Sequence, residues 1–490
     1  MTQRVEIEES RTLEDYAAVA HLAQTVAELR EEAEKTVPHL AGRTVWMVNS
    51  TSRGGGVAEM LPTMVALLRD LGVKTEWVII ESERPEFFAL TKQLHNLIHG
   101  AGSPRLESNS RALFEAENRE NAEWLRQQLK PGDILVVHDP QPMPLAGVLK
   151  EQLDISTVWR CHIGLDEENA ATRAAWEFLA PYSNAYERAV FSAPEYVPPF
   201  FSDRSEIIHP AINPISEKNK DLHLHKLVGI LANSALSVAP GPLVTLPLPD
   251  LVHRLQGGDG SYRPANAWDD IGLLTRPIIT QVSRWDRLKG FLPLMEAFVR
   301  LKREMLKGKG TEGWENRRRL DLVRLVLAGP DPASIQDDPE GQEVMAELHA
   351  AYGELDPRLQ DDIAVITLPM SSARHNALIV NALHRASSLV VQNSLREGFG
   401  LTVTEAMWKR VPILTNSKAC GPRQQVRDGL DGRLIADPED ADELAHAMNE
   451  MLADAEGRDD WGRSAQRRTH QNFLVFSQLR AWLRLFAKLL

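Results

Sequence analysis

Residues 396–405 read REGFGLTVTE, and this stretch indicates the fold more clearly than any other. It places two carboxylates, Glu397 and Glu405, eight positions apart around a short glycine turn. An apolar run at 388–391 precedes the turn, and a helical pattern follows it at 406–408. In an open α/β sheet, ligands bind where a strand ends and a helix begins. The stretch therefore predicts a ligand-binding turn in an α/β protein.

Apolar runs alternate with helical patterns along most of the chain. Strands are expected at 44–49, 74–81, 133–139, 156–163, 277–284, 322–329, 363–369, 387–392 and 411–416. Such alternation predicts parallel sheets covered by helices on both faces. The stretch 218–275, rich in Pro and Gly, interrupts the alternation, and we expect an irregular excursion there, near a domain boundary.

Length and composition restrict the protein class. With 490 residues and 43% hydrophobic content, the chain is long enough for two domains with separate cores. A net charge of -13 argues against binding nucleic acid through a basic surface. The first ten residues, MTQRVEIEES, lack the apolar core of a signal peptide, and no apolar run is long enough to span a bilayer. With Cys161 and Cys420 as the only cysteines, a disulfide framework is not expected, and we predict a cytoplasmic protein without a membrane span.

The segment 473–490 combines apolar residues with interleaved Arg480, Arg484 and Lys488. A basic amphipathic helix can lie on a membrane surface. The favoured interpretation is a terminal helix that docks its apolar face on the protein.

A glycine cluster at 53–59, RGGGVAE, follows the strand expected at 44–49 and precedes a helical run. Consecutive glycines let backbone amides approach an anion at a helix N-terminus. The spacing fits neither the dinucleotide-binding fingerprint nor a P-loop, and alone the cluster is as consistent with a tight turn.

Arg284 and Lys289 lie five positions apart at the end of the strand expected at 277–284. A guanidinium fork and an ammonium point charge at one strand-to-helix junction can both reach a diphosphate. A solvated basic turn is the alternative, and the overall acidity of the chain slightly favours the site.

The opening stretch supplies groups suited to a sugar nucleotide. Carboxylates accept hydrogen bonds from vicinal hydroxyls, so one glutamate for a hexose and one for a ribose is a chemical interpretation of Glu397 and Glu405. The amides of the turn that contains Phe399 and Gly400 can bond sugar hydroxyls. The alternative is that Glu405 is a surface acid and Glu397 a cap.

Two further strand ends carry polar groups, Asp139 and His162. An α/β sheet exposes such positions to its ligand crevice. Cys161 beside His162 makes a poor zinc site without a second pair, and Asp440 with Asp442 is better explained as helix capping than as a metal motif. No metal site is predicted.

These elements, in this order, resemble the retaining glycosyltransferases of family four. The family pattern is carried by Glu397 and Glu405 together with Arg284 and Lys289. The stretches VNSTSRGGGVAEML, VVHDPQP, WRCHIGLD and FSAPEYVPPF narrow the likeness to the trehalose glycosyltransferring synthases and, more distantly, to fungal trehalose phosphorylases. The chain departs from the pattern at 218–275 and at 418–422, where KACGP replaces the usual glycine pair.

The resemblance implies the GT-B fold, with two Rossmann-like domains facing a cleft and a C-terminal helix packing back on the N-terminal domain. The expected boundaries are 1–215 for the acceptor-side domain, 216–275 for an insertion or linker, 276–465 for the nucleotide-sugar domain and 466–490 for the C-terminal helix.

The resemblance also implies a role for each matching residue. Catalysis would involve Arg284, Lys289, Asp139 and His162. The donor would be bound by Gly55, Gly56, Glu397, Phe399, Gly400, Leu401, Thr402 and Glu405. The acceptor would be bound by Asp139, Glu59 and Arg160.

The implied reaction moves glucose from a nucleoside diphosphate glucose, ADP-glucose before UDP-glucose, to free glucose, forming α,α-trehalose with retention. We expect no tightly bound cofactor and no requirement for a metal. The partners would be sugars and sugar nucleotides, and the resemblance suggests a homodimer. Three alternatives remain: a trehalose phosphorylase, a glucosyltransferase for another small acceptor such as glycerate or glycerol, and an inactive sugar-nucleotide-binding protein. The sequence itself does not decide the nucleobase.

Overall fold

The structure is a computed structural model that describes residues 2–7, 11–52, 55–267, 270–306, 313–334 and 339–490. The chain forms two compact units. Unit 1 comprises residues 1–211 and 472–490, and unit 2 comprises 212–471. The boundaries expected at 215 and 465 therefore lie at 211 and 471, and the C-terminal segment belongs to unit 1, as predicted.

Unit 1 contains a seven-stranded sheet in the order β1-β3-β2-β4-β5-β6-β7. Its strands are β1 (Gln3–Arg4), β2 (Val45–Asn49), β3 (Thr75–Ile79), β4 (Ile134–His138), β5 (Ser156–Arg160), β6 (Arg188–Phe191) and β7 (Ser205–Ile207). β1 pairs with β3 antiparallel, and every other pair is parallel. β2 and β4 are buried along their whole length, which explains their continuous apolar sequences.

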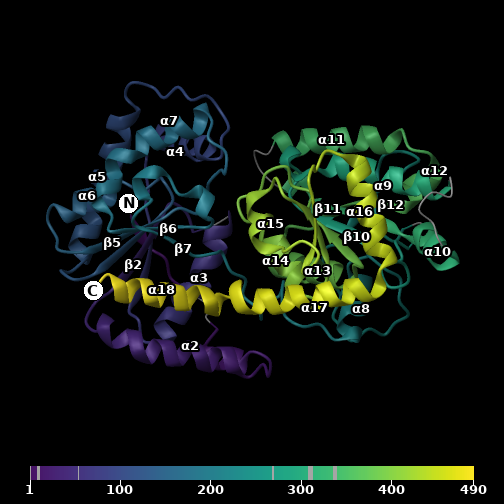
Figure 1. The fold of residues 1–490 in the computed structure, drawn as a ribbon, viewed down its shortest axis with the longest axis horizontal. Coiled ribbons are helices and arrows are strands. Elements are labelled where there is room, and N and C mark those ends of the chain that lie inside the picture. The colour runs from purple at the N-terminus through teal and green to yellow at the C-terminus, as the bar shows by residue number, and fades with distance from the viewer. Residues whose placement is uncertain (1, 8–10, 53–54, 268–269, 307–312, 335–338) are drawn as a thin grey trace. The chain divides into compact units, whose positions relative to one another are not determined.

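Helices of unit 1 lie on both faces of this sheet (Figure 1). They include α1 (Leu13–Ala17), α2 (Ala23–Thr36), α3 (Gly55–Asp70), α4 (Pro85–Ile98), α5 (Ser110–Gln128), α6 (Leu145–Lys150) and α7 (Ala170–Leu179). α3 begins at Gly55, inside the glycine cluster, so the helix predicted after the strand at 44–49 is confirmed and starts within the cluster.

The last helix, α18 (Val475–Lys488), packs against α2. Its apolar side chains, including Phe476, Trp482 and Phe486, are buried. Its basic residues form ion pairs at the edge of this contact, with Arg480 3.1 Å from Glu28. The docked interpretation of the segment is therefore confirmed.

We expect Trp482→Ala to lower the free energy of unfolding of unit 1 by about 3–5 kcal/mol, because it opens a cavity where the indole is 1% exposed. Arg484→Ala in the same helix should cost at most about 1 kcal/mol, because the Arg484 side chain is 61% exposed in its ion pair with Glu32. Calorimetric melting of both variants checks this. Equal losses would show that the apolar face of α18 contributes little.

Unit 2 contains an eight-stranded sheet in the order β15-β14-β13-β10-β11-β12-β8-β9. The strands from the predicted list are β10 (Ile278–Val282), β11 (Arg324–Pro330), β12 (Ile363–Leu368), β13 (Leu389–Val391) and β14 (Ile413–Asn416). These pair in parallel, and β15 (Gly432–Ile435) continues the sheet beyond β14. Two mixed, mainly parallel sheets covered by helices are the GT-B architecture that the sequence predicts.

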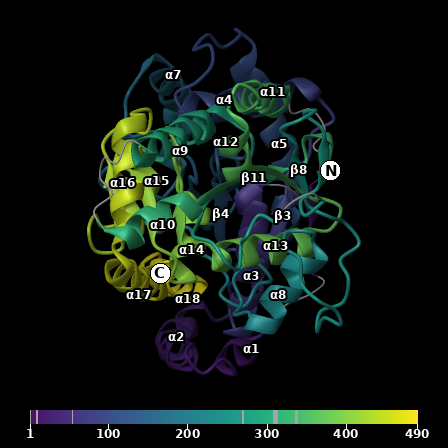
Figure 2. The same ribbon diagram turned by 90° about the vertical axis from the view of Figure 1, so that its right-hand side faces the viewer.

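The excursion at 218–275 is part of unit 2 rather than a linker. It forms α8 (Leu224–Asn233) and the antiparallel strands β8 (His253–Leu255) and β9 (Tyr262–Pro264), which extend the sheet beyond β12. α8 packs against α13 (Ala373–Ala386), as Figure 2 shows. Neither strand is a continuous apolar run, so periodicity did not indicate them.

The remaining helices of unit 2 cover the sheet. They are α9 (Phe291–Leu306), α10 (Trp314–Leu322), α11 (Pro339–Gly353), α12 (Pro357–Asp362), α14 (Leu401–Trp408), α15 (Cys420–Gln425), α16 (Ala441–Ala453) and α17 (Ala455–Asn472). Within the described ranges, no helix has both the length and the apolar character needed to cross a bilayer.

Candidate functional site

The turn that carries Lys289 is held against the end of β13 by a buried glutamine. Gln281, in β10, donates from Nε2 to the Lys289 carbonyl at 2.7 Å and accepts from the Asn393 amide at 2.9 Å. Asp286 caps the 3₁₀ turn Arg287–Lys289 by accepting from the Leu288 amide. The backbone of Lys289 is thus fixed by side chains on two elements.

Lys289 and Glu397 meet although they lie far apart in the sequence. Their Nζ and Oε2 atoms are 2.6 Å apart, and the two side chains are 14% and 18% exposed. β10 and β13 are parallel neighbours, so their carboxyl ends bring the two residues to one edge of the sheet. The structure thus joins two of the predicted donor-side residues in one charged contact.

Arg284 stands apart from this contact. Its side chain is 71% exposed, and its nearest carboxylate is Asp286 at 3.8 Å. The structure shows no link between Arg284 and Lys289, so their joint action on one diphosphate stays a prediction.

The glycine turn leads into α14, as predicted. Gly400 precedes the helix with φ of 82°, a left-handed conformation that favours glycine. The amides of Leu401 and Thr402 start the helix, where no earlier turn offers them a carbonyl. A helix N-terminus of this kind suits an anion.

Glu405 lies one turn inside α14 and is 7% exposed. Its carboxylate is 3.6 Å from Lys218, and its carbonyl accepts a hydrogen bond from Lys409 Nζ at 2.9 Å. Burial lowers the pKa of Lys409, and the charge of Glu405 opposes that shift. The alternative that Glu405 is a surface acid is wrong. Neither lysine was predicted from the sequence, although Lys409 follows Glu405 at helical spacing.

In unit 1, the parallel pairing of β4 and β5 brings Asp139 and His162 together. Asp139 Oδ1 accepts from the His162 amide at 2.8 Å, and the Asp139 amide donates to the Arg160 carbonyl at 2.7 Å. Asp139 adopts φ of 62°, which is rare for a residue with a side chain. Burial raises the pKa of Asp139 to about 6, against the His162 hydrogen bond and the charge of Arg160.

Two histidines lie beside this carboxyl group. His138 Nδ1 and His162 Nε2 are 2.9 Å apart, and the rings stack. Burial, with the positive charge of Arg160 as a second cause, lowers the pKa of His138 to about 3 and that of His162 well below its usual value. Both rings are therefore neutral at pH 7, and one donates a hydrogen bond to the other.

Arg160 is 1% exposed and donates to Ser192 Oγ at 3.2 Å. This burial disagrees with a direct contact between Arg160 and an acceptor, because the side chain offers no surface to a sugar. The family resemblance had implied that Arg160 binds the acceptor. Its charge instead acts on Asp139 and the two histidines.

The glycine loop is partly covered by the structure. Residues 53 and 54 lie outside the described residues, whereas Gly55 and Gly56 form the first turn of α3. A Cβ added at Gly56 would meet no atom within 4 Å, so open space adjoins its backbone. Glu59 follows in the same helix and is exposed.

Asp440 caps α16, because its side chain accepts from the amides of Asp442 and Glu443. The capping interpretation of this motif is confirmed.

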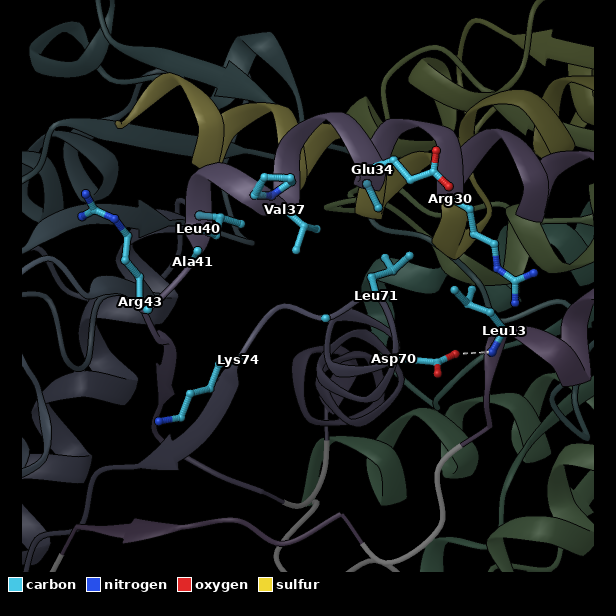
Figure 3. A pocket seen from close by; sticks show the side chains of 14 residues that line it. Leu13, Arg30, Glu34, Val37, Leu40, Ala41, Arg43, Asp70, Leu71 and Lys74 are labelled. Atoms are coloured by element: carbon cyan, nitrogen blue, oxygen red, sulfur yellow. Dashed lines mark hydrogen bonds between the residues drawn. The ribbon is translucent and has the colours of Figure 1, made fainter.

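A pocket of about 800 Å³ lies elsewhere in unit 1 (Figure 3). It is lined by residues of α2 and by Arg43 and Lys74, which precede β2 and β3. These are the amino ends of parallel strands, opposite the ends that carry Asp139 and His162. None of the predicted site residues lines this pocket.

Two family models match separate stretches of this chain, and known proteins match nearly all of it. Residues 47–198 match the family model "Trehalose synthase, N-terminal domain", and residues 373–468 match "Glycosyl transferases group 1". The chain is 34% identical to a trehalose synthase of Pyrococcus horikoshii over 96% of this chain and 95% of the relative. It is 32% identical to a trehalose synthase of Rubrobacter xylanophilus over 98% of this chain and 97% of that one.

Solved structures agree on the fold. The crystal structure of a UDP-forming α,α-trehalose-phosphate synthase from Burkholderia vietnamiensis matches with a TM-score of 0.62 and 18% identity, over 92% of this chain and 99% of that chain. The fold is that of the GT-B trehalose-phosphate synthases, and the chain belongs to the trehalose synthase family of glycosyltransferases.

Proposed function

We propose that this protein transfers glucose from a nucleoside diphosphate glucose to the anomeric hydroxyl of free glucose, forming α,α-trehalose with retention. The contact between Lys289 and Glu397 carries the proposal. The Lys289 ammonium and the Glu397 carboxylate lie 2.6 Å apart, which supports a cation for the diphosphate beside a carboxylate for the hexose. Glu405 lies one turn into the next helix, where a ribose carboxylate is expected.

On the donor side, Glu397 and the turn amides bind the hexose, and the start of α14 binds phosphate through the amides of Leu401 and Thr402. Lys289 stabilises the charge that develops on the departing diphosphate, with Arg284 as the second cation. Fixed charge aimed at a developing anion is often the largest contribution to catalysis. Lys289 exchanges its partner Glu397 for phosphate when the donor binds.

On the acceptor side, the ionised carboxylate of Asp139 accepts a hydrogen bond from a hydroxyl of the incoming glucose. Neutral His162 contacts the transferred glucose, and its ring is oriented by the hydrogen bond to His138. Gly55 and Gly56 approach the donor phosphates through backbone amides, and Glu59 contributes to the acceptor site.

Retention follows if the acceptor attacks the face that the leaving group departs from, and a donor phosphate oxygen then takes the proton. Lys289 and Arg284 supply positive charge at the diphosphate, so we propose that turnover needs no metal and persists in EDTA. ADP-glucose is the first donor proposed and UDP-glucose the second.

A grid of donors and acceptors tests the function. ADP-glucose, UDP-glucose and GDP-glucose are each incubated with glucose, glycerate or glycerol, and the products are separated by chromatography. α,α-Trehalose from ADP-glucose and glucose is the expected result, with the anomeric configuration established by NMR. If product forms with glycerate or glycerol but not with glucose, the acceptor is not glucose and the proposed reaction is wrong.

The phosphorylase alternative is tested in reverse. Trehalose is supplied with either ADP or inorganic phosphate, and ADP-glucose is expected from the first mixture only. Glucose 1-phosphate from the second would favour a phosphorylase, in which Glu405 has no ribose to bind. No product in any mixture would leave an inactive binding protein.

The cytoplasmic location and the homodimer belong to the same proposal. Light scattering of the purified chain is expected to give twice the mass of one chain.

A further inference from the structure

A buried glutamine holds the inner side of the donor turn. Gln425 is the last residue of α15 and is 0% exposed. Its side-chain amide donates to the carbonyl of Phe399, and the carbonyls of Gly400 and Gly421 are 3.3 Å and 3.4 Å from the same nitrogen. Its oxygen accepts from Thr404 Oγ1 at 2.5 Å. One side chain therefore contacts the turn, the following helix and its own helix.

The Gln425 contacts determine where the turn amides point. A peptide group is planar and trans, so the carbonyl of one residue and the amide of the next point in opposite directions. With the Phe399 carbonyl held at Gln425, the amide of Gly400 points away from Gln425. The Gly400 carbonyl also faces Gln425, so the amide of Leu401 likewise points away from Gln425. These are amides that the proposed function assigns to the donor.

Two neighbouring features leave this turn little freedom. A Cβ added at Gly421 would lie 2.2 Å from the Phe399 Cα, so the turn packs directly on α15. The Gln425 carbonyl accepts from Arg468 Nε at 2.6 Å, which ties α15 to α17. The glutamine is thus itself fixed in place.

We propose that Gln425 is a positioning residue for the donor, which orients the amides of Gly400 and Leu401 toward the sugar nucleotide. This inference rests on the proposed function, because it presumes that a sugar nucleotide binds at this turn. An ordinary buried glutamine would stabilise the fold without any selective effect on nucleotide binding.

Gln425→Glu separates these two roles. Glutamate keeps the shape and still accepts from Thr404, but its ionised form cannot donate to the turn carbonyls and repels them. Its protonated form can donate again, and burial favours that form. We expect ADP to bind about 10–100-fold more weakly than to the wild type at pH 8, and the ratio to approach one as the pH falls to 6.

The measurement is calorimetric titration of ADP and UDP into the full-length wild type and variant at pH 6, 7 and 8. Gln466→Glu is the matched control, because Gln466 Nε2 also donates to a backbone carbonyl of unit 2, that of Trp408 at 2.9 Å. This control should bind nucleotide like the wild type at every pH. A Gln425→Glu variant with wild-type affinity, or with a loss that does not depend on pH, would overturn the positioning role.

A second variant covers the case in which Gln425→Glu does not fold. Thr404→Val removes the hydroxyl that orients the glutamine, and should weaken ADP binding about 3–10-fold without pH dependence. Unchanged affinity would count against the inference. If the wild type binds neither ADP nor UDP, the proposed function fails together with the inference about Gln425. If the wild type binds nucleotide and the variants bind it equally well, only the role of Gln425 is overturned.

Discussion

Lys289→Ala is expected to lower kcat about 10²–10³-fold while leaving the fold intact, because it removes the cation proposed to stabilise the leaving diphosphate. The cost in stability should be about 1–3 kcal/mol, because the Glu397 carboxylate loses its partner at a site where its side chain is only 18% exposed. Initial rates at saturating donor and acceptor, with a melting curve for the same preparation, measure both effects.

Arg287→Ala is the matched control for this substitution. Arg287 lies in the same turn, but its guanidinium bonds to Glu343 and Glu347 of α11. The substitution should remove two surface ion pairs and cost little turnover. Near wild-type turnover in Lys289→Ala, or an equal loss in Arg287→Ala, would remove Lys289 from the proposed mechanism.

Asp139→Asn is expected to lower turnover about 10²-fold and yet to raise the melting temperature above pH 6. Turnover falls because the amide carries no charge with which to accept from the acceptor hydroxyl. The folded-state pKa of Asp139, about 6, lies above the ordinary value of 3.8. The folded protein therefore holds this proton more tightly than the unfolded chain, and Asp139 destabilises the fold progressively as the pH rises from about 4 to about 6.

The difference in melting temperature between wild type and Asp139→Asn, taken from pH 4.5 to pH 8, isolates this effect. The lowered pKa values of His138 and His162 act in the opposite direction, but they are common to both proteins. Wild-type turnover should also decline as the pH falls through about 6.

Asp133→Asn gives the opposite result for stability. Asp133 lies at the other end of β4 and accepts from the Thr44 and Lys130 amides and from the Trp46 indole. An asparagine has only one acceptor oxygen and cannot accept all of these hydrogen bonds. The variant should therefore melt at a lower temperature than the wild type at pH 8. If Asp139→Asn also melts at a lower temperature than the wild type at pH 8, the pKa of Asp139 is not raised in the folded protein.

The parts of the fold that the sequence predicts are those with strong local signals. β2 and β4 are continuous apolar runs because both faces of a parallel sheet are covered. β7 escaped notice because none of its residues is fully buried. β8 and β9 pair antiparallel at a sheet edge, where polar residues are tolerated, and therefore resemble loops.

The same division holds for the site. The glycine turn and Glu405 could be located because a strand end, a glycine and a helix start are adjacent in the sequence. Gln281 and Gln425 could not, because a glutamine acquires its role from partners that the fold brings from distant positions. Arg160 shows the converse case, since the family resemblance implied contact with the acceptor and the side chain is buried.

The chain passes from unit 1 to unit 2 and back again, because α18 completes the first unit after the second has been encoded. During synthesis, the apolar surface that Trp482 and Phe486 cover stays open until all of residues 212–471 have left the ribosome. Domains usually fold in the order in which they are made. Here the order is reversed for the final step: unit 2 can close first, and the amino-terminal unit, translated earliest, reaches its native core last.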